Sequence, residues 1–167
     1  MKDPILLVED QENDAFFLKR AFGVAGIQNP IQVVQDGKEA MNYLSGIGVY
    51  ADRARFPMPC LILLDLKLPR VMGLEVLRWL RAQSELKTLI VLILTSSRAA
   101  TDIEMAYQLG VNGYLVKPSG SEELQEIARG IKAFWLEANI GPLMQRGSAK
   151  PSRPDAKGEI GTYDQRF

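Results

Sequence analysis

Cys60-Leu-Ile-Leu-Leu-Asp65-Leu-Lys-Leu-Pro69-Arg-Val-Met-Gly73 is the most informative segment of the sequence, because it places a single acid directly after a wholly apolar run. The run lacks polar alternation, which is typical of a strand buried on both faces of a parallel sheet. Pro69 and Gly73 then end the extended segment. Ligands of open α/β sheets bind outside the carboxyl ends of the strands, so we expect Asp65 to face a crevice.

Similar short apolar runs are spaced along the chain and alternate with segments of helical periodicity. We expect strands at 5–8, 31–34, 60–64, 89–94 and 113–116, and helices at 14–25, 37–44, 74–83, 99–109 and about 121–136, the last one preceded by a capping box at 119–122. This order predicts an α/β domain over residues 1–140, with a doubly wound five-stranded parallel sheet and five helices. Residues 141–167 hold four glycines and three prolines without a sustained period, so we expect a flexible C-terminal tail there.

The composition excludes several classes of protein. Twenty basic and twenty acidic residues give no net charge, so the overall electrostatics do not favour nucleic acid or an anionic membrane as a partner. The absence of histidine excludes a histidine-based triad, a histidine metal site and a phosphohistidine relay within this chain. The N-terminus lacks the plan of a signal peptide, and no apolar run approaches the length of a membrane span, which predicts a cytoplasmic protein.

Polar residues follow four of the predicted strands. Glu9 and Asp10 follow the first, Asp65 the third, Thr95 the fourth and Lys117 the fifth. Three acids at one crevice would repel one another unless a cation lay between them, and Mg²⁺ prefers such oxygen ligands. The Lys117 ammonium and the Thr95 hydroxyl can serve phosphoryl oxygens. The pattern predicts a phosphoryl-transfer site, with the Asp65 carboxylate as the best candidate nucleophile.

The chain resembles the receiver domains of two-component response regulators from residue 4 to about 136. The motifs that carry this resemblance are the acidic pair Glu9-Asp10, Asp65-Leu-Lys-Leu-Pro, Leu94-Thr95 and Tyr114-Leu-Val-Lys117-Pro118. The resemblance implies a flavodoxin-like receiver fold in which Asp65 accepts phosphate from a histidine of a sensor kinase. It also implies a Mg²⁺ site formed by Glu9, Asp10, Asp65 and the backbone carbonyl of Lys67.

The same resemblance assigns further roles around the site. Thr95 and Tyr114 would be the switch pair, Lys117 would contact the phosphoryl group, and the bond between Lys117 and Pro118 would be cis. Such a domain is not an enzyme in the usual sense, with at most weak self-phosphorylation and self-dephosphorylation. Lys67 departs from the polar uncharged residue often found at that position, although its carbonyl is unaffected.

The segment 45–59 is longer than a connection in a compact domain needs. It contains residue types that are enriched in interface anchors, which suggests partner recognition: Tyr50, Arg53, Arg55 and Phe56. This segment and the run 130–137 also look like single-domain regulators that serve bacterial phytochromes. The narrower resemblance implies a phytochrome as the partner kinase.

We expect phosphorylation to control self-association, with a homodimer formed through the fourth helix, the fifth strand and the fifth helix. Thr95 and Tyr114 lie at the edge of that face, and the apolar stripe of the last helix continues through Phe134 and Trp135. A two-fold pairing would use this patch twice. Neither nucleic acid nor a membrane is an expected partner.

Two other functions stay open on the same fold. A Mg²⁺-dependent phosphatase of the haloacid dehalogenase type also forms an aspartyl phosphate, but it would place an acid two residues after the nucleophile, where this chain has Lys67. A flavodoxin-like binding module for flavin or nucleotide would need a glycine-rich or hydroxyl-rich cradle after the first strand. The segment Gln11-Glu-Asn-Asp14 is acidic instead.

Overall fold

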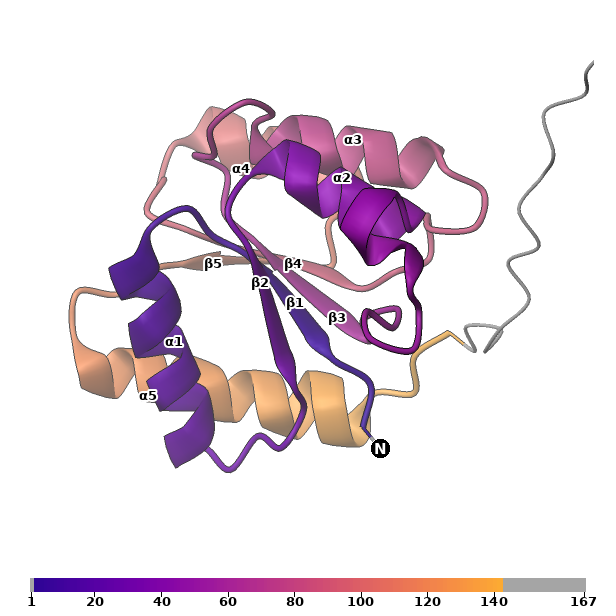
Figure 1. Cartoon of the computed structure of the whole chain (residues 1–167). Coiled ribbons are helices and arrows are strands. Elements are labelled where there is room, and N and C mark those ends of the chain that lie inside the picture. Colours follow the sequence, from indigo (N-terminus) through magenta and orange to yellow (C-terminus); the bar gives the residue numbers. More distant parts are fainter. Residues whose placement is uncertain (1, 143–167) are drawn as a thin grey trace, which may run out of the picture.

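The computed structural model describes residues 2–142, which form a five-stranded sheet with helices on both faces (Figure 1). The strands are β1 (Ile5–Val8), β2 (Ile31–Val34), β3 (Leu61–Leu64), β4 (Val91–Thr95) and β5 (Gly113–Val116). Their order in the sheet is β2-β1-β3-β4-β5, and all neighbouring strands are parallel. The predicted doubly wound fold is confirmed. The chain changes its winding direction between β1 and β3, where open α/β sheets bind their ligands.

Helices cover both faces of this sheet. They are α1 (Glu12–Val24), α2 (Gly37–Ser45), α3 (Gly73–Ala82), α4 (Ala100–Gln108) and α5 (Ser121–Gly130), with a short 3-10 helix η1 (Gly48–Ala51) and a π-helical segment η2 (Ile131–Ala138). Helices α1 and α5 pack on one face, and α2, α3 and α4 cover the other (Figure 1). None of the helices in residues 2–142 is long and apolar enough to cross a membrane. The tail expected at 141–167 lies outside the described residues except for its first two.

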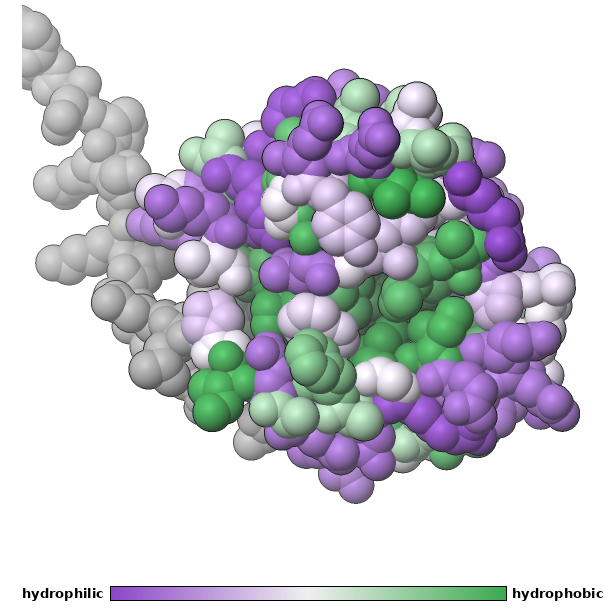
Figure 2. All heavy atoms as spheres, turned by 180° about the vertical axis from the view of Figure 1, so that it is seen from behind, coloured by the Kyte–Doolittle hydropathy of each residue, from purple (hydrophilic) through white to green (hydrophobic). Residues whose placement is uncertain are grey.

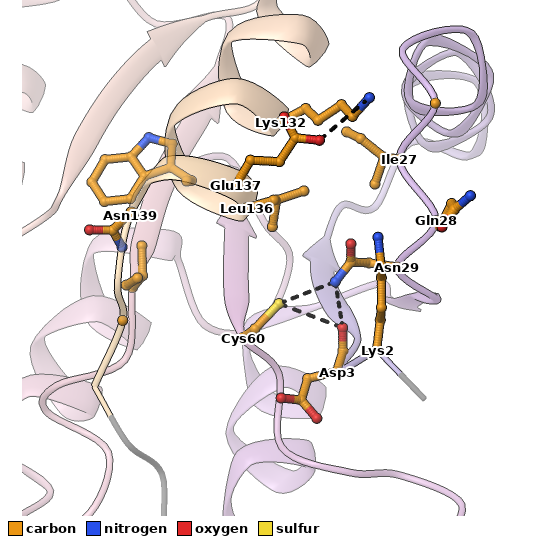
Figure 3. Close-up of a pocket in the computed structure, with 14 residues that line it drawn as sticks. Lys2, Asp3, Ile27, Gln28, Asn29, Cys60, Lys132, Leu136, Glu137 and Asn139 are labelled. Carbon is orange, nitrogen blue, oxygen red and sulfur yellow. Dashed lines mark hydrogen bonds and ion pairs between the residues drawn. The ribbon is translucent and has the colours of Figure 1, made fainter.

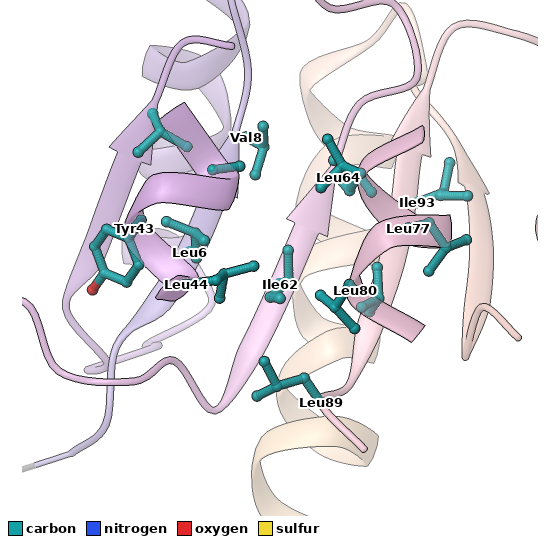
Figure 4. Close-up of a cluster of buried hydrophobic side chains, with 14 of the residues drawn as sticks. Leu6, Val8, Tyr43, Leu44, Ile62, Leu64, Leu77, Leu80, Leu89 and Ile93 are labelled. Atoms are coloured by element: carbon teal, nitrogen blue, oxygen red, sulfur yellow. The ribbon is translucent and has the colours of Figure 1, made fainter. Parts of the chain in front are cut away.

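Alternate residues of each strand face opposite helical layers, which divides the core into two clusters. Leu6 and Val8 of β1 pack with the layer of α2, α3 and α4, whereas Ile5 and Leu7 pack with α1 and α5. All four side chains are at most 2% exposed. Figure 4 shows the first cluster, in which side chains of α2 and α3 meet those of β1 and β3. Each such side chain contributes about 1.5–3 kcal/mol on burial, so the strand ends form a rigid platform for a site.

The long segment 45–59 is folded back onto α2. The rings of Tyr43, Tyr50 and Phe56 form a cluster with centroids 5.0–6.1 Å apart. The Tyr50 hydroxyl donates to Glu39 at 2.6 Å, and the Arg53 guanidinium donates to the carbonyl of Tyr43 at 2.7 Å. Tyr50 and Arg53 thus contact α2 within the domain, and partner recognition by this segment stays a prediction.

Two local predictions are also corrected. No peptide bond is cis in the described residues, so the bond between Lys117 and Pro118 is trans, the lower-energy form of such bonds. The N-cap of α5 is Gly120, and no side chain caps it. The predicted capping box therefore does not form, because Ser119 lies one residue too early.

The last helix is not α-helical throughout. In η2 the N–H of Asn139 bonds to the carbonyl of Phe134 at 2.7 Å, which is the five-residue spacing of a π-helix. This wider turn lets Lys132 and Glu137 form an ion pair at 3.6 Å. The sequence predicted one uninterrupted helix here, because apolar spacing does not separate the two windings.

Candidate functional site

The carboxyl ends of four strands bring the predicted polar residues together at one edge of the sheet. Glu9 directly follows β1, Asp65 follows β3, Thr95 ends β4 and Lys117 follows β5. Glu9 is 4% exposed, Asp65 is 6% exposed and Thr95 is fully buried. Acids this deeply buried need compensating partners.

The backbone after β3 holds Asp65 in place. The N–H of Lys67 donates to Oδ1 of Asp65 at 3.2 Å. Further along, the N–H of Gly73 donates to the carbonyl of Leu66 at 3.0 Å. A Cβ at Gly73 would lie 2.2 Å from the carbonyl oxygen of Asp65, so a larger residue would push α3 away from the site.

The Lys117 ammonium lies among three carboxylates. Its Nζ donates to Oε2 of Glu9 at 2.6 Å, to Oδ2 of Asp65 at 2.6 Å and to Oδ2 of Asp14 at 2.8 Å. The N–H of Lys117 also donates to the carbonyl of Thr95 at 2.8 Å, which fixes the backbone at the end of β5. Sequence analysis noted Asp14 only as part of an acidic segment. Its position in the first turn of a helix that follows the acidic pair was the available signal.

Charge and burial oppose each other in this cluster. Burial raises the pKa of Glu9, and the hydrogen bond and charge of Lys117 offset this effect only in part. Burial lowers the pKa of Lys117, but its hydrogen bonds to the three carboxylates outweigh burial and raise it. Lys117 is therefore a permanent cation that reduces the repulsion between Glu9 and Asp65.

A chain of hydrogen bonds links the predicted switch pair through Ser97. The N–H of Ser97 donates to Oγ1 of Thr95 at 3.5 Å, and the hydroxyl of Tyr114 donates to the carbonyl of Ser97 at 3.2 Å. The Ser97 hydroxyl donates to Asp102 in the first turn of α4 at 2.5 Å. Burial is also the main cause that raises the pKa of Tyr114. Sequence analysis did not identify Ser97, since a serine in a loop carries no distinctive signal.

Three acids of this site suit a metal ion. One carboxylate oxygen from each of Glu9, Asp10 and Asp65 lies within 4.8 Å of the others. In an octahedral Mg²⁺ site opposite ligand oxygens are about 4 Å apart, so small side-chain movements would suffice. Hard carboxylate oxygens are the donors that Mg²⁺ and Mn²⁺ prefer. The Lys67 backbone lies beside them, because its N–H contacts Asp65.

A separate cavity of about 430 Å³ lies at the opposite end of the strands (Figure 3). Its lining includes Cys60, Asn29, Lys132 and Trp135. The Asn29 amide donates to the carbonyl of Asp3 at 2.8 Å and approaches the Cys60 sulfur at 3.7 Å. No residue predicted for the phosphoryl-transfer site lines this cavity, so it is no part of that site.

A family model, the response regulator receiver domain, matches residues 5–129 of the chain. Among curated proteins, the probable methanogenesis regulatory protein FilR2 of Methanothrix harundinacea is 38% identical over 84% of this chain and 90% of its own length. The response regulator Rcp1 of Synechocystis sp. is 38% identical over 80% of this chain and 88% of its own length.

Solved structures of response regulators are also similar to this chain. The phosphorylated cyanobacterial phytochrome response regulator RcpA matches with a TM-score of 0.79 and 37% identity, over 85% of this chain and 99% of that one. The Mn²⁺-bound form of Rcp1 matches with a TM-score of 0.76 and 36% identity, over 84% of this chain and 99% of that one. Neither alternative left open above, the phosphatase and the flavodoxin-like binding module, is supported by these matches.

Proposed function

Because this chain belongs to the family of response regulator receiver domains, we propose that Asp65 is its phosphoacceptor and that a sensor histidine kinase is the donor. The observation that supports this most is the position of the Asp65 carboxylate. It is nearly buried at the end of β3, with the Lys117 ammonium 2.6 Å from its Oδ2. Output then comes from protein contacts that depend on the phosphorylated state.

The transfer needs the two proteins and a divalent cation. An oxygen of Asp65 attacks the phosphorus of a phosphohistidine on the kinase, a P–O bond forms, and the P–N bond breaks. The imidazole leaves with the electron pair. In this proposal the Lys117 ammonium and the Thr95 hydroxyl stabilise negative charge on the transferred group. With these groups alone, self-phosphorylation from a small donor and self-dephosphorylation would both be weak.

We propose Mg²⁺ as the cofactor, held by carboxylates of Glu9, Asp10 and Asp65 and by the carbonyl of Lys67. The cluster of acidic oxygens and the Mn²⁺-bound form of the relative Rcp1 support this assignment. A bound Mg²⁺ would neutralise charge between the acids and the phosphoryl oxygens. Glu9 and Asp10 directly follow β1, and the N–H of Glu9 donates to the carbonyl of Val34 at 3.0 Å, which fixes the backbone where the strand ends.

We propose a bacterial phytochrome as the partner kinase on the strength of the relative RcpA, whose structure is that of a phytochrome response regulator. FilR2 is equally similar in sequence to this chain, and its name refers to methanogenesis. Phosphotransfer from a purified phytochrome kinase is therefore the test for the partner. Labelling by acetyl phosphate without labelling by the phytochrome would refute the partner and leave the phosphoacceptor intact.

We further propose that Thr95 and Tyr114 act as the switch and that the phosphorylated domain pairs through α4, β5 and α5. The residues of β5 are only half-buried although most are apolar. Figure 2 views the molecule from the side of β5 and shows hydrophobic residues gathered in a hollow. Tyr107 and Phe134 are more than half exposed. A second copy of the domain could cover such a surface.

Intact-mass measurement after treatment with acetyl phosphate and Mg²⁺ tests the phosphoacceptor. We expect one phosphate adduct on the wild type, and none on Asp65→Asn or without the metal. Glu9→Ala with Asp10→Ala should also abolish the metal-dependent adduct, because the ligands are lost. Asp52→Asn is the matched control, since Asp52 is exposed and accepts only local bonds from Ala54 and Arg55. An adduct that persists on Asp65→Asn would refute the assignment.

A further inference from the structure

Asp14 contacts Lys117 but stands apart from the acids that suit a metal ion. It lies in the first turn of α1, and its side chain is 45% exposed, against 3% for Glu9 and 7% for Asp65. The three acids whose oxygens converge are Glu9, Asp10 and Asp65, and Asp14 is not among them. Within residues 2–142, its contact with the site is therefore the hydrogen bond that it accepts from Lys117 at 2.8 Å.

An ammonium has three N–H donors, and Lys117 uses them on three carboxylates. Two of these acceptors change state in the proposed reaction, because Asp65 becomes an acyl phosphate and Glu9 would bind the metal ion. In that state both carboxyl groups would accept weaker hydrogen bonds from the Lys117 ammonium. The third acceptor, Asp14, takes part in neither event and keeps its full charge.

The geometry places these acceptors on different elements. Glu9 and Asp65 approach Nζ from the ends of β1 and β3, whereas Asp14 approaches it from α1. The backbone of Lys117 is fixed by its bond to Thr95, so the four-carbon stem is the mobile part. A contact from α1 restricts that stem at its charged end.

From this geometry we infer that Asp14 is a positioning residue, which holds the Lys117 ammonium at the mouth of the site while Glu9 and Asp65 change partners. Only the expected effect on the rate of phosphorylation rests on the proposed function. The restraint on Lys117 itself follows from the side-chain contacts of its ammonium alone.

The variant Asp14→Asn keeps the shape of the side chain and removes its charge. Glu12→Gln is the matched control, because Glu12 is an exposed acid in the same first turn of α1. We expect Asp14→Asn to lower the rate of labelling by acetyl phosphate at saturating Mg²⁺ by about fivefold, the upper range for a half-exposed ion pair. Glu12→Gln should change it by less than about 1.5-fold, because only screened long-range charge is lost. Asp14→Glu should restore most of the rate.

A second measurement follows Lys117 directly in metal-free protein without phosphodonor. Ammonium protons held in hydrogen bonds exchange slowly with water, so lysine-labelled protein should give a ¹⁵N NMR signal for the Lys117 ammonium. We expect the signal in the wild type and in Glu12→Gln, and its loss or broadening in Asp14→Asn. An unchanged signal, or equal rate losses in the two variants, would overturn the inference. Absence of any label on wild-type Asp65 would refute the proposed function instead, and the NMR comparison would still decide the role of Asp14.

Discussion

At the scale of single residues, Lys117 connects more of the site than any acid does alone. It joins acids from the end of β1, from α1 and from the end of β3, and its N–H fixes it to the last residue of β4. Removing a cation from buried acids leaves them uncompensated, which costs more than the pair contributed. The lysine therefore offsets the repulsion between these acids, in addition to the role proposed for it at the phosphoryl group.

Lys117→Met, which keeps the length of the apolar stem, should therefore lower the free energy of unfolding in metal-free buffer by about 3 kcal/mol at neutral pH. Urea denaturation measures this loss. Added Mg²⁺ should restore most of it, because a divalent cation can compensate the same carboxylates. A variant as stable as the wild type without metal would contradict this account. Lys132→Met is the control, since its pair with Glu137 is long, at 3.6 Å, and the Glu137 side chain is 60% exposed.

Cys60 allows a pH-dependent prediction at a distance from the site. Burial, together with the charge of Asp3, raises the pKa of the Cys60 thiol above its ordinary 9.0. Alkylation by iodoacetamide should accordingly be several-fold slower in the folded protein than in urea at the same pH. A raised folded pKa also means that the thiol's stabilising contribution is complete below pH 9.0 and is lost as the pH rises through the folded pKa. Cys60→Ala should lack this alkaline loss, and equal alkylation rates would contradict the prediction.

The polar residues that sequence reasoning found are those placed by strands. Glu9, Asp65, Thr95 and Lys117 follow apolar runs, and parallel strands end at one edge, so their meeting was predictable. The contact of Asp14 with Lys117 depends on the orientation of α1 relative to the sheet. Ser97 depends on a loop conformation, in which it bonds to Thr95, Tyr114 and Asp102. Neither position follows from periodicity.

At the scale of elements, the segment 45–59 packs against α2 and stabilises the C-terminal end of that helix. Arg53 donates to the carbonyls of Tyr43 and Leu44 in the last turn of α2, and the Tyr43 carbonyl also accepts from the N–H of Gly46 at 3.1 Å. Gly46 ends α2 with φ 67°, and a Cβ there would lie 2.9 Å from the Arg53 guanidinium. Glycine thus satisfies the left-handed turn and makes room for the arginine. Sequence length flagged this segment, but its inward contacts could not be read from residue types alone.

Arg53→Ala should destabilise the domain by about 2 kcal/mol, because charged hydrogen bonds to helix-end carbonyls are lost. Arg55→Ala, from the same segment, should cost only about 0.5 kcal/mol, since its exposed side chain contacts just the Phe56 ring at 5.2 Å. Urea denaturation with an unchanged slope measures both. Equal losses from the two variants would contradict the assignment of Arg53 to the C-terminus of α2.

At the scale of the whole molecule, the strand order places the proposed phosphorylation site and the proposed pairing surface in different parts of the sheet. The acids lie over β1 and β3, whereas β5 is the edge strand beside α4. The link that crosses this distance runs from Thr95 through Ser97 to Asp102 of α4 and Tyr114 of β5. A phosphoryl group can shift pairing only if it interacts differently with the two arrangements of this link. The fold was predictable because the strands are short and mainly apolar, but pairing depends on which side chains stay exposed.

Phe134→Ser tests the proposed pairing through α4, β5 and α5. Phe134 is 56% exposed, so the change should spare the fold, unlike a change at the half-buried Trp135. Sedimentation equilibrium with beryllofluoride, a phosphoryl mimic, should show wild-type dimers, with a dissociation constant about tenfold weaker in Phe134→Ser, as expected for an interface aromatic.

Phe16→Ser is the matched control, since Phe16 is 61% exposed on α1, outside the proposed surface. It should leave pairing unchanged. Equal weakening of dimerisation by both phenylalanine variants would show that the interface does not lie at α4, β5 and α5. A monomer with and without beryllofluoride at high protein concentration would contradict pairing altogether. The exposed apolar surface would then be the expected contact site for a different partner.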